Sequence, residues 1–154
     1  MPKDHISVSE NLGEEQEQTL IALLNLIIPP SEDGRMPSAA DVGFFAYLQA
    51  QGEIRWIKEG LIRVVEEARK EYGKEFSTLS GSEQMRLIEK LRRTLFRFLG
   101  ELTTEVIQCY YQNDQVLKAI GLEARAPFPQ GYTVDDGDLT LLEPVYERGK
   151  LYRD

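Results

Sequence analysis

Apolar residues recur at three- and four-residue spacing from residue 14 to residue 121, with charged residues between them. This is the period of an amphipathic α-helix that buries one face. The pattern predicts helices over residues 14–28, 39–51, 54–72 and 81–109, followed by a short helix that ends at Gly121. We therefore expect an all-α fold, a compact bundle of about five to six helices.

Residues that start or stop helices set the predicted ends. Pro29 and Pro30 stop the first helix, because proline cannot continue the helical hydrogen bonds. Ser38 is the expected N-cap of the second helix, and Gly52 and Gly73 are expected to end the second and third. The inner stripe of the second helix is predicted at Val42, Phe45, Ala46 and Leu48 or Gln49.

The last long helical run has a clear start and a predicted break. Ser80 and Glu83 form the S-x-x-E pattern of a capping box, so a helix should start at Gly81. Apolar periodicity then continues to Cys109, which is long for one globular helix. We favour a break or bend near Arg93 and Thr94 over a single continuous helix.

The chain after Gly121 loses helical periodicity but stays rich in Phe, Tyr, Val and Leu. Exposed apolar side chains gain nothing in water, so such a segment normally lies against another surface. We predict a mobile N-terminus over 1–13, the bundle over 14–121, and an extended Pro- and Gly-punctuated tail over 122–154 that packs on the bundle or on a partner. A short β-hairpin is compatible with the D-G pair within "YTVDDGDLTLL".

Composition and charge narrow the class of partner. The 154 residues are 42% hydrophobic and 29% charged, as expected for one soluble globular domain. A net charge of −8 and a pI near 4.8 disfavour nucleic acid and anionic membranes, which both require a basic surface. The longest apolar run is also too short to cross a membrane.

The inventory of reactive side chains is small. His5 is the only histidine and Cys109 the only cysteine, which argues against Ser-His-Asp, Cys-His and multi-cysteine metal sites. Cys109 continues the stripe of Leu102 and Val106, so we interpret it as a buried hydrophobe. No glycine-rich phosphate loop occurs, and "DDGD" reads as a turn rather than a calcium loop. We predict no catalytic, cofactor-binding or metal site in this chain.

Aromatic residues are the least ordinary feature. Tyr and Trp suit boundaries where one edge of the ring is apolar and the other is wet. The residues predicted to form a partner interface are Trp56, Tyr110, Tyr111, Phe128 and Tyr132.

Four ordered signatures support a resemblance over residues 19–132. They are I-I-P at 27–29, P-S-A-A-D-V-G at 37–43, Y-G-x-x-F-x-x-L-S at 72–80, and an aromatic pair followed by G-x-x-x-x-x-P-x-P-x-G at 121–131. This order resembles the gluconate 2-dehydrogenase subunit 3 family, the small subunits of flavin-dependent sugar and sugar-acid dehydrogenases.

The resemblance implies a noncatalytic accessory subunit that binds and stabilises a large FAD-bearing catalytic subunit, often beside a multi-haem cytochrome subunit. It also associates such subunits with twin-arginine export. No twin-arginine leader is seen in the first residues, so the chain as written is expected to be cytoplasmic, or periplasmic if a leader was removed or a partner carries it across. The alternative is a stand-alone or self-associating helical bundle that binds a small ligand or another protein.

Overall fold

The structure, a computed structural model, describes residues 12–52, 55–125, 129, 131 and 137–149. The chain divides into two units, Met1–Ala124 and Arg125–Asp154. The predicted mobile N-terminus falls mostly on residues outside the described ranges, as do Phe128 and Tyr132. The predicted packing of the tail, residues 122–154, on the bundle or on a partner also stays a prediction.

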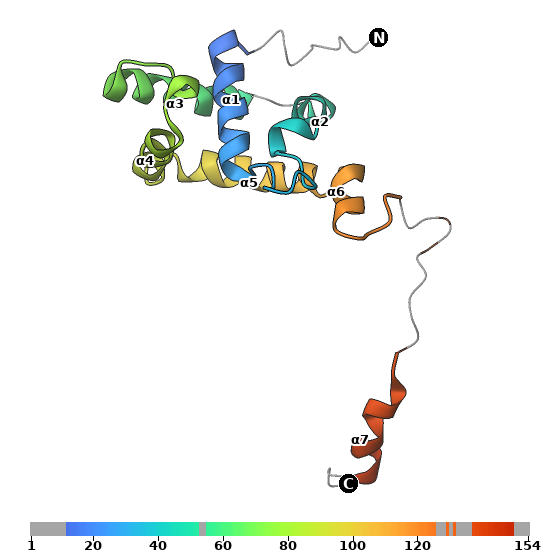
Figure 1. The fold of residues 1–154 in the computed structure, drawn as a ribbon. Coiled ribbons are helices and arrows are strands. Elements are labelled where there is room, and N and C mark those ends of the chain that lie inside the picture. Colours follow the sequence, from blue (N-terminus) through green and yellow to red (C-terminus); the bar gives the residue numbers. More distant parts are fainter. Residues whose placement is uncertain (1–11, 53–54, 126–128, 130, 132–136, 150–154) are drawn as a thin grey trace. The chain divides into compact units, whose positions relative to one another are not determined.

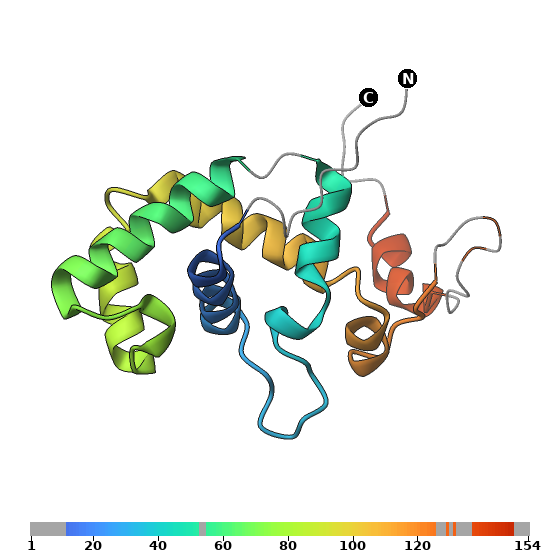
Figure 2. The ribbon, with the colours of Figure 1, turned by 90° about the horizontal axis from the view of Figure 1, so that it is seen from above.

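The described residues form helices and no strand, which confirms the all-α prediction. In the first unit α1 (Glu14–Ile27) is the central helix, in contact with α3 (Arg55–Tyr72), α5 (Phe96–Tyr110) and the 3-10 turns at Ala39–Asp41 and Phe76–Thr78 (Figures 1 and 2). The elements of this unit are α1 Glu14–Ile27, η2 Ala39–Asp41, α2 Phe44–Gln51, α3 Arg55–Tyr72, η3 Phe76–Thr78, α4 Gly81–Leu91, α5 Phe96–Tyr110 and α6 Asp114–Ala119. The second unit contains η4 Leu139–Leu142 and α7 Glu143–Glu147.

The core of the first unit is made by the apolar stripes that the sequence predicts. Each stripe follows helical spacing, so one side of each helix faces the others and excludes water. The buried members are Leu20, Leu23 and Leu24 on α1, Ile57, Leu61, Val64 and Ala68 on α3, and Leu102, Val106 and Cys109 on α5.

The predicted capping box and helix break are both present. The Ser80 amide donates to Glu83 Oε2 at 2.8 Å and the Ser80 hydroxyl accepts from the Glu83 amide at 3.4 Å, so α4 starts at Gly81. Helix α4 ends at Leu91, and the Leu95 amide donates to the Leu91 carbonyl at 2.8 Å before α5 begins.

The predicted continuous helix over residues 39–51 is wrong. A 3-10 turn at Ala39–Asp41 is separated from α2 by Gly43, whose φ of 78° lies in the left-handed region that an α-helix cannot include. The restart changes the helical phase, so Phe44 is buried in place of the predicted Phe45, and Ala46 is exposed. Ser38 gives no side-chain cap to a backbone amide; its hydroxyl donates to Asp41 Oδ2 at 2.7 Å instead.

The described part of the proposed hairpin is helical. Asp138 Oδ1 accepts from the Thr140 amide at 3.1 Å, a local turn that starts η4. Pro144 in the first turn of α7 then favours helix, because its fixed φ is already helical. The other arm, residues 132–136, lies outside the described residues.

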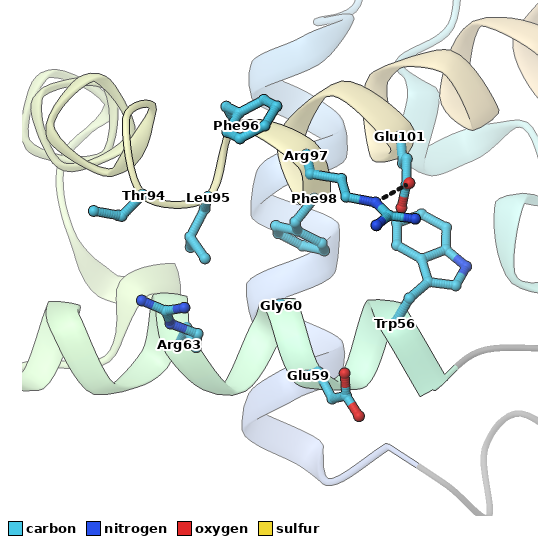
Figure 3. Close-up of a pocket in the computed structure, with 10 residues that line it drawn as sticks. All are labelled: Trp56, Glu59, Gly60, Arg63, Thr94, Leu95, Phe96, Arg97, Phe98 and Glu101. Carbon is cyan, nitrogen blue, oxygen red and sulfur yellow. Dashed lines mark hydrogen bonds and ion pairs between the residues drawn. The ribbon is translucent and has the colours of Figure 1, made fainter.

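The crossing of α3 and α5 depends on one glycine. A Cβ atom on Gly60 would overlap Cδ2, Cε2 and Cγ of Phe98. Figure 3 shows the Phe98 ring directed at the α3 backbone at Gly60. Because these atoms belong to the body of a ring that is 8% exposed, no flexible chain end can move aside.

We therefore expect Gly60→Ala to destabilise the bundle by about 1–3 kcal/mol, the usual cost of overpacking a core. Gly100 on α5 is the matched control, since a Cβ there would meet nothing within 4 Å. Gly100→Ala should stabilise by about 0.5–1 kcal/mol through helix propensity. Urea unfolding of both variants measures the difference, and equal stability of the two would contradict this account.

Candidate functional site

An open groove of about 430 Å³ lies between α3 and α5 of the first unit (Figure 3). Its base is aromatic: the Trp56 and Phe98 rings meet edge to face, with centroids 6.1 Å apart at an interplanar angle of 62°. The lining residues are Trp56, Glu59, Gly60, Arg63, Thr94, Leu95, Phe96, Arg97, Phe98 and Glu101.

Local sequence explains how the aromatic residues reach the groove. Trp56 lies one helical turn before Gly60, so both face α5, and the missing side chain at Gly60 lets the Phe98 ring lie beside Trp56. At the start of α5, Leu95 and Phe98 take the buried positions, which leaves Phe96 between them 72% exposed. The exposed Phe96 and the partly buried Trp56 lie on opposite sides of Phe98 and give the groove apolar surface that water covers (Figure 3).

Charged side chains form the rim. Arg97 Nε donates to Glu101 Oε1 at 2.8 Å, and this hydrogen bond raises the pKa of the Arg97 guanidinium. The pair is exposed and i,i+4 on one helix, so it stabilises the fold little. Glu59 and Arg63 line the α3 side. An apolar centre inside a polar rim is the usual anatomy of a protein–protein interface.

The groove is lined by apolar and charged side chains. No histidine or cysteine lines it. Cys109 is 5% exposed in the core, and this burial raises the pKa of its thiol, which confirms the interpretation as a buried hydrophobe. Among the described residues, no group of three or more His, Cys, Asp or Glu side chains could hold a metal ion.

The two neighbouring tyrosines have different surroundings. Tyr110 is 2% exposed, its hydroxyl donates to the Pro37 carbonyl at 2.8 Å, and burial raises its pKa. It therefore joins α5 to the loop before η2 and presents no face to a partner. Tyr111 packs edge to face on it, with centroids 5.4 Å apart, and is 50% exposed. Of the described candidates, Trp56 and Tyr111 are the ones a partner could contact directly.

The sequence alone did not identify Gly60 or Phe96 as groove residues. The available signal was an apolar residue off the buried stripe: Phe96 directly follows stripe position Leu95, so both cannot face inward. Nothing in the spacing alone shows that Gly60 meets an aromatic ring, because that contact is between two helices.

A family profile described as gluconate 2-dehydrogenase subunit 3 matches residues 14–123. The chain belongs to the gluconate 2-dehydrogenase subunit 3 family. The match confirms the resemblance seen in the sequence, and it relates the chain to a subunit of a dehydrogenase complex. No curated protein and no solved structure was found to match.

All groove residues of this subunit 3 protein fall inside the matched range, whereas η4 and α7 lie beyond it. Within the part of the chain that the structure describes, no helix combines the length and apolar character needed to span a membrane.

The contrast between the tyrosines gives a matched test. Tyr110→Phe should cost about 0.5–1.5 kcal/mol of unfolding free energy, since the Pro37 carbonyl loses its donor. Tyr111→Phe removes a hydroxyl from an exposed ring and should change stability by less than about 0.5 kcal/mol. Thermal and urea unfolding measure both; equal losses would show that the buried hydrogen bond does not stabilise the fold.

Proposed function

We propose that this gluconate 2-dehydrogenase subunit 3 protein is a noncatalytic accessory subunit that binds and stabilises the FAD-bearing catalytic subunit of a sugar or sugar-acid dehydrogenase. The family match over residues 14–123 is the observation that carries the proposal. The aromatic groove between α3 and α5 supports it, because it offers binding surface without reactive groups.

This chain can stabilise a catalytic subunit without catalysing any reaction itself. A ligand that binds only the folded form of a protein shifts its folding equilibrium by mass action, about 2.7 kcal/mol when present at 100 times its Kd. The groove provides residue types that contribute strongly at interfaces, since Trp56 and Phe96 can enter a partner's apolar pocket while the charged rim excludes water.

The cofactors of such a complex belong to its other subunits. FAD-binding folds cradle the pyrophosphate with a glycine-rich loop between a strand and a helix, and the described residues have neither strand nor such a loop. Covalent haem needs a C-x-x-C-H sequence, and Cys109 is the only cysteine. The residues present do not fit either group, so we assign this chain no step through them.

Affinity purification of the tagged full chain from its own cells tests the proposal. We expect a stoichiometric flavoprotein, recognised by flavin absorbance and identified by mass spectrometry, and greater heat resistance of that flavoprotein when this chain is bound. A colourless chain recovered alone would contradict the proposal.

Phe96→Ser tests the groove itself. Phe96 is 72% exposed, so the bundle should lose less than about 0.5 kcal/mol. Losing an interface aromatic should raise the Kd for the purified flavoprotein about tenfold or more. Ile62→Ser is the matched control: Ile62 is exposed on α3 but does not line the groove. Equal Kd values for the two variants, measured by calorimetry, would place the contact elsewhere.

A further inference from the structure

The outward face of α5 carries no charge. Its five residues recur at positions i, i+4, i+8, i+11 and i+15, the spacing of one side of a helix. We call them the outer stripe of α5: Phe96, Gly100, Thr104, Ile107 and Tyr111. The three large side chains are 72%, 44% and 50% exposed, in chain order, and the other two residues are exposed as well.

Such a face is unusual on the outside of a bundle. Helix α3 shows the usual arrangement, since the exposed Glu66 and Lys70 lie opposite its buried stripe. On α5 the side that faces the core is apolar and the opposite side is uncharged too. A helix of this kind is typically covered on both sides.

The charged residues of α5 stand beside the outer stripe and already have partners in this chain. Arg97 is hydrogen-bonded to Glu101 at 2.8 Å, and the Tyr47 hydroxyl donates to Glu105 Oε2 at 2.7 Å. An apolar surface can therefore cover the stripe without leaving a new charge buried and unpaired.

Gly100 indicates that a backbone comes close to the middle of the stripe. Glycine destabilises a helix interior relative to alanine, and here it has ordinary right-handed helical geometry. A Cβ atom at this position would meet nothing within 4 Å, so no contact among the described residues requires glycine. Thr104, one turn later, donates its hydroxyl to the Gly100 carbonyl at 2.9 Å and needs no acceptor from a partner. The missing side chain leaves a depression in which a second helix can pack at short distance.

Length and charge indicate where that second helix comes from. Helix α5 has 15 residues, so the stripe is about 22 Å long at 1.5 Å per residue. The described helices after Ala124, η4 and α7, have four and five residues and reach only about 15 Å together. A second copy would add another net charge of −8, and this repulsion opposes self-association. A helix of a different protein fits better than either.

We propose that the outer stripe of α5 packs against an apolar helix of about four turns in the catalytic subunit, and that the backbone of this helix crosses α5 at Gly100. The inference rests on the proposed function. Phe96 belongs to both the stripe and the groove, so the two surfaces form one interface. This interface extends from Trp56 in the groove to Tyr111 at the end of α5.

The first test separates binding from folding, because a methyl group at Gly100 has opposite effects on the two. Gly100→Ala should raise the melting temperature of the chain by about 2–5 °C, since alanine favours helix. The same methyl group overpacks the helix contact and should raise the Kd for the copurified flavoprotein about fivefold or more, with a larger rise for Gly100→Gln. A weaker complex formed by a more stable chain is not a folding defect.

Gly81→Ala is the matched control. Gly81 is exposed in the first turn of α4, away from the stripe, and a Cβ atom there would also meet nothing within 4 Å. This variant should not lower the melting temperature and should leave the Kd unchanged. Equal Kd values for Gly100→Ala, Gly100→Gln and Gly81→Ala, measured by calorimetry, would overturn the inference.

A photoreactive side chain identifies what covers the stripe. The probe is p-benzoyl-phenylalanine in place of Tyr111, which is half exposed at the end of the stripe away from the groove. On irradiation of the complex it should crosslink to the flavoprotein, within a stretch whose apolar residues recur at helical spacing, as mass spectrometry can show. Crosslinks to residues 125–154 or to a second copy of the chain would contradict the inference.

The outcomes distinguish this inference from the proposed function. If the wild type recovers no flavoprotein, the proposed function fails, and the inference fails with it. If the flavoprotein is recovered but both Gly100 variants bind it with wild-type affinity, only the helix contact on α5 is wrong and the proposed function stands.

Discussion

The contact between the Phe98 ring and the Gly60 backbone sets how closely α3 and α5 cross in the first unit. It brings α3 and α5 closer than any side chain at position 60 would allow. The core positions Leu61 and Leu102 follow from this approach, because each lies next to the crossing on its own helix and is fully buried. Packing at this density tolerates little change in volume, so the crossing and the core are determined together.

The same contact creates the groove. Phe98 occupies the space above Gly60, and Trp56 one turn earlier packs on the edge of the ring rather than sinking into the core. Phe96 is then left outside because Leu95 before it and Phe98 two residues after it take the buried positions. The apolar surface between α3 and α5 is thus a consequence of how the helices cross.

Much of the fold could be predicted because its signals are local. Helical spacing located the buried stripes, and the Ser80 and Glu83 pair located the start of α4. The continuous helix over 39–51 was wrong because periodicity does not report φ, and Gly43 changes the helical phase there. The candidate site was less predictable: the Tyr110 hydrogen bond to Pro37 and the Phe98 contact with Gly60 join residues far apart in sequence.

The described aromatic residues of this chain include a buried set and an exposed set. Phe44, Phe76 and Tyr110 are fully or almost fully buried, so their apolar surface already contributes to the stability of the bundle. Phe96, Tyr111 and Tyr146 are at least half exposed and contribute little to it. Their burial becomes favourable only when another surface covers them. A surface that covered these rings would therefore gain the free energy of burying them without any loss of stability in the bundle.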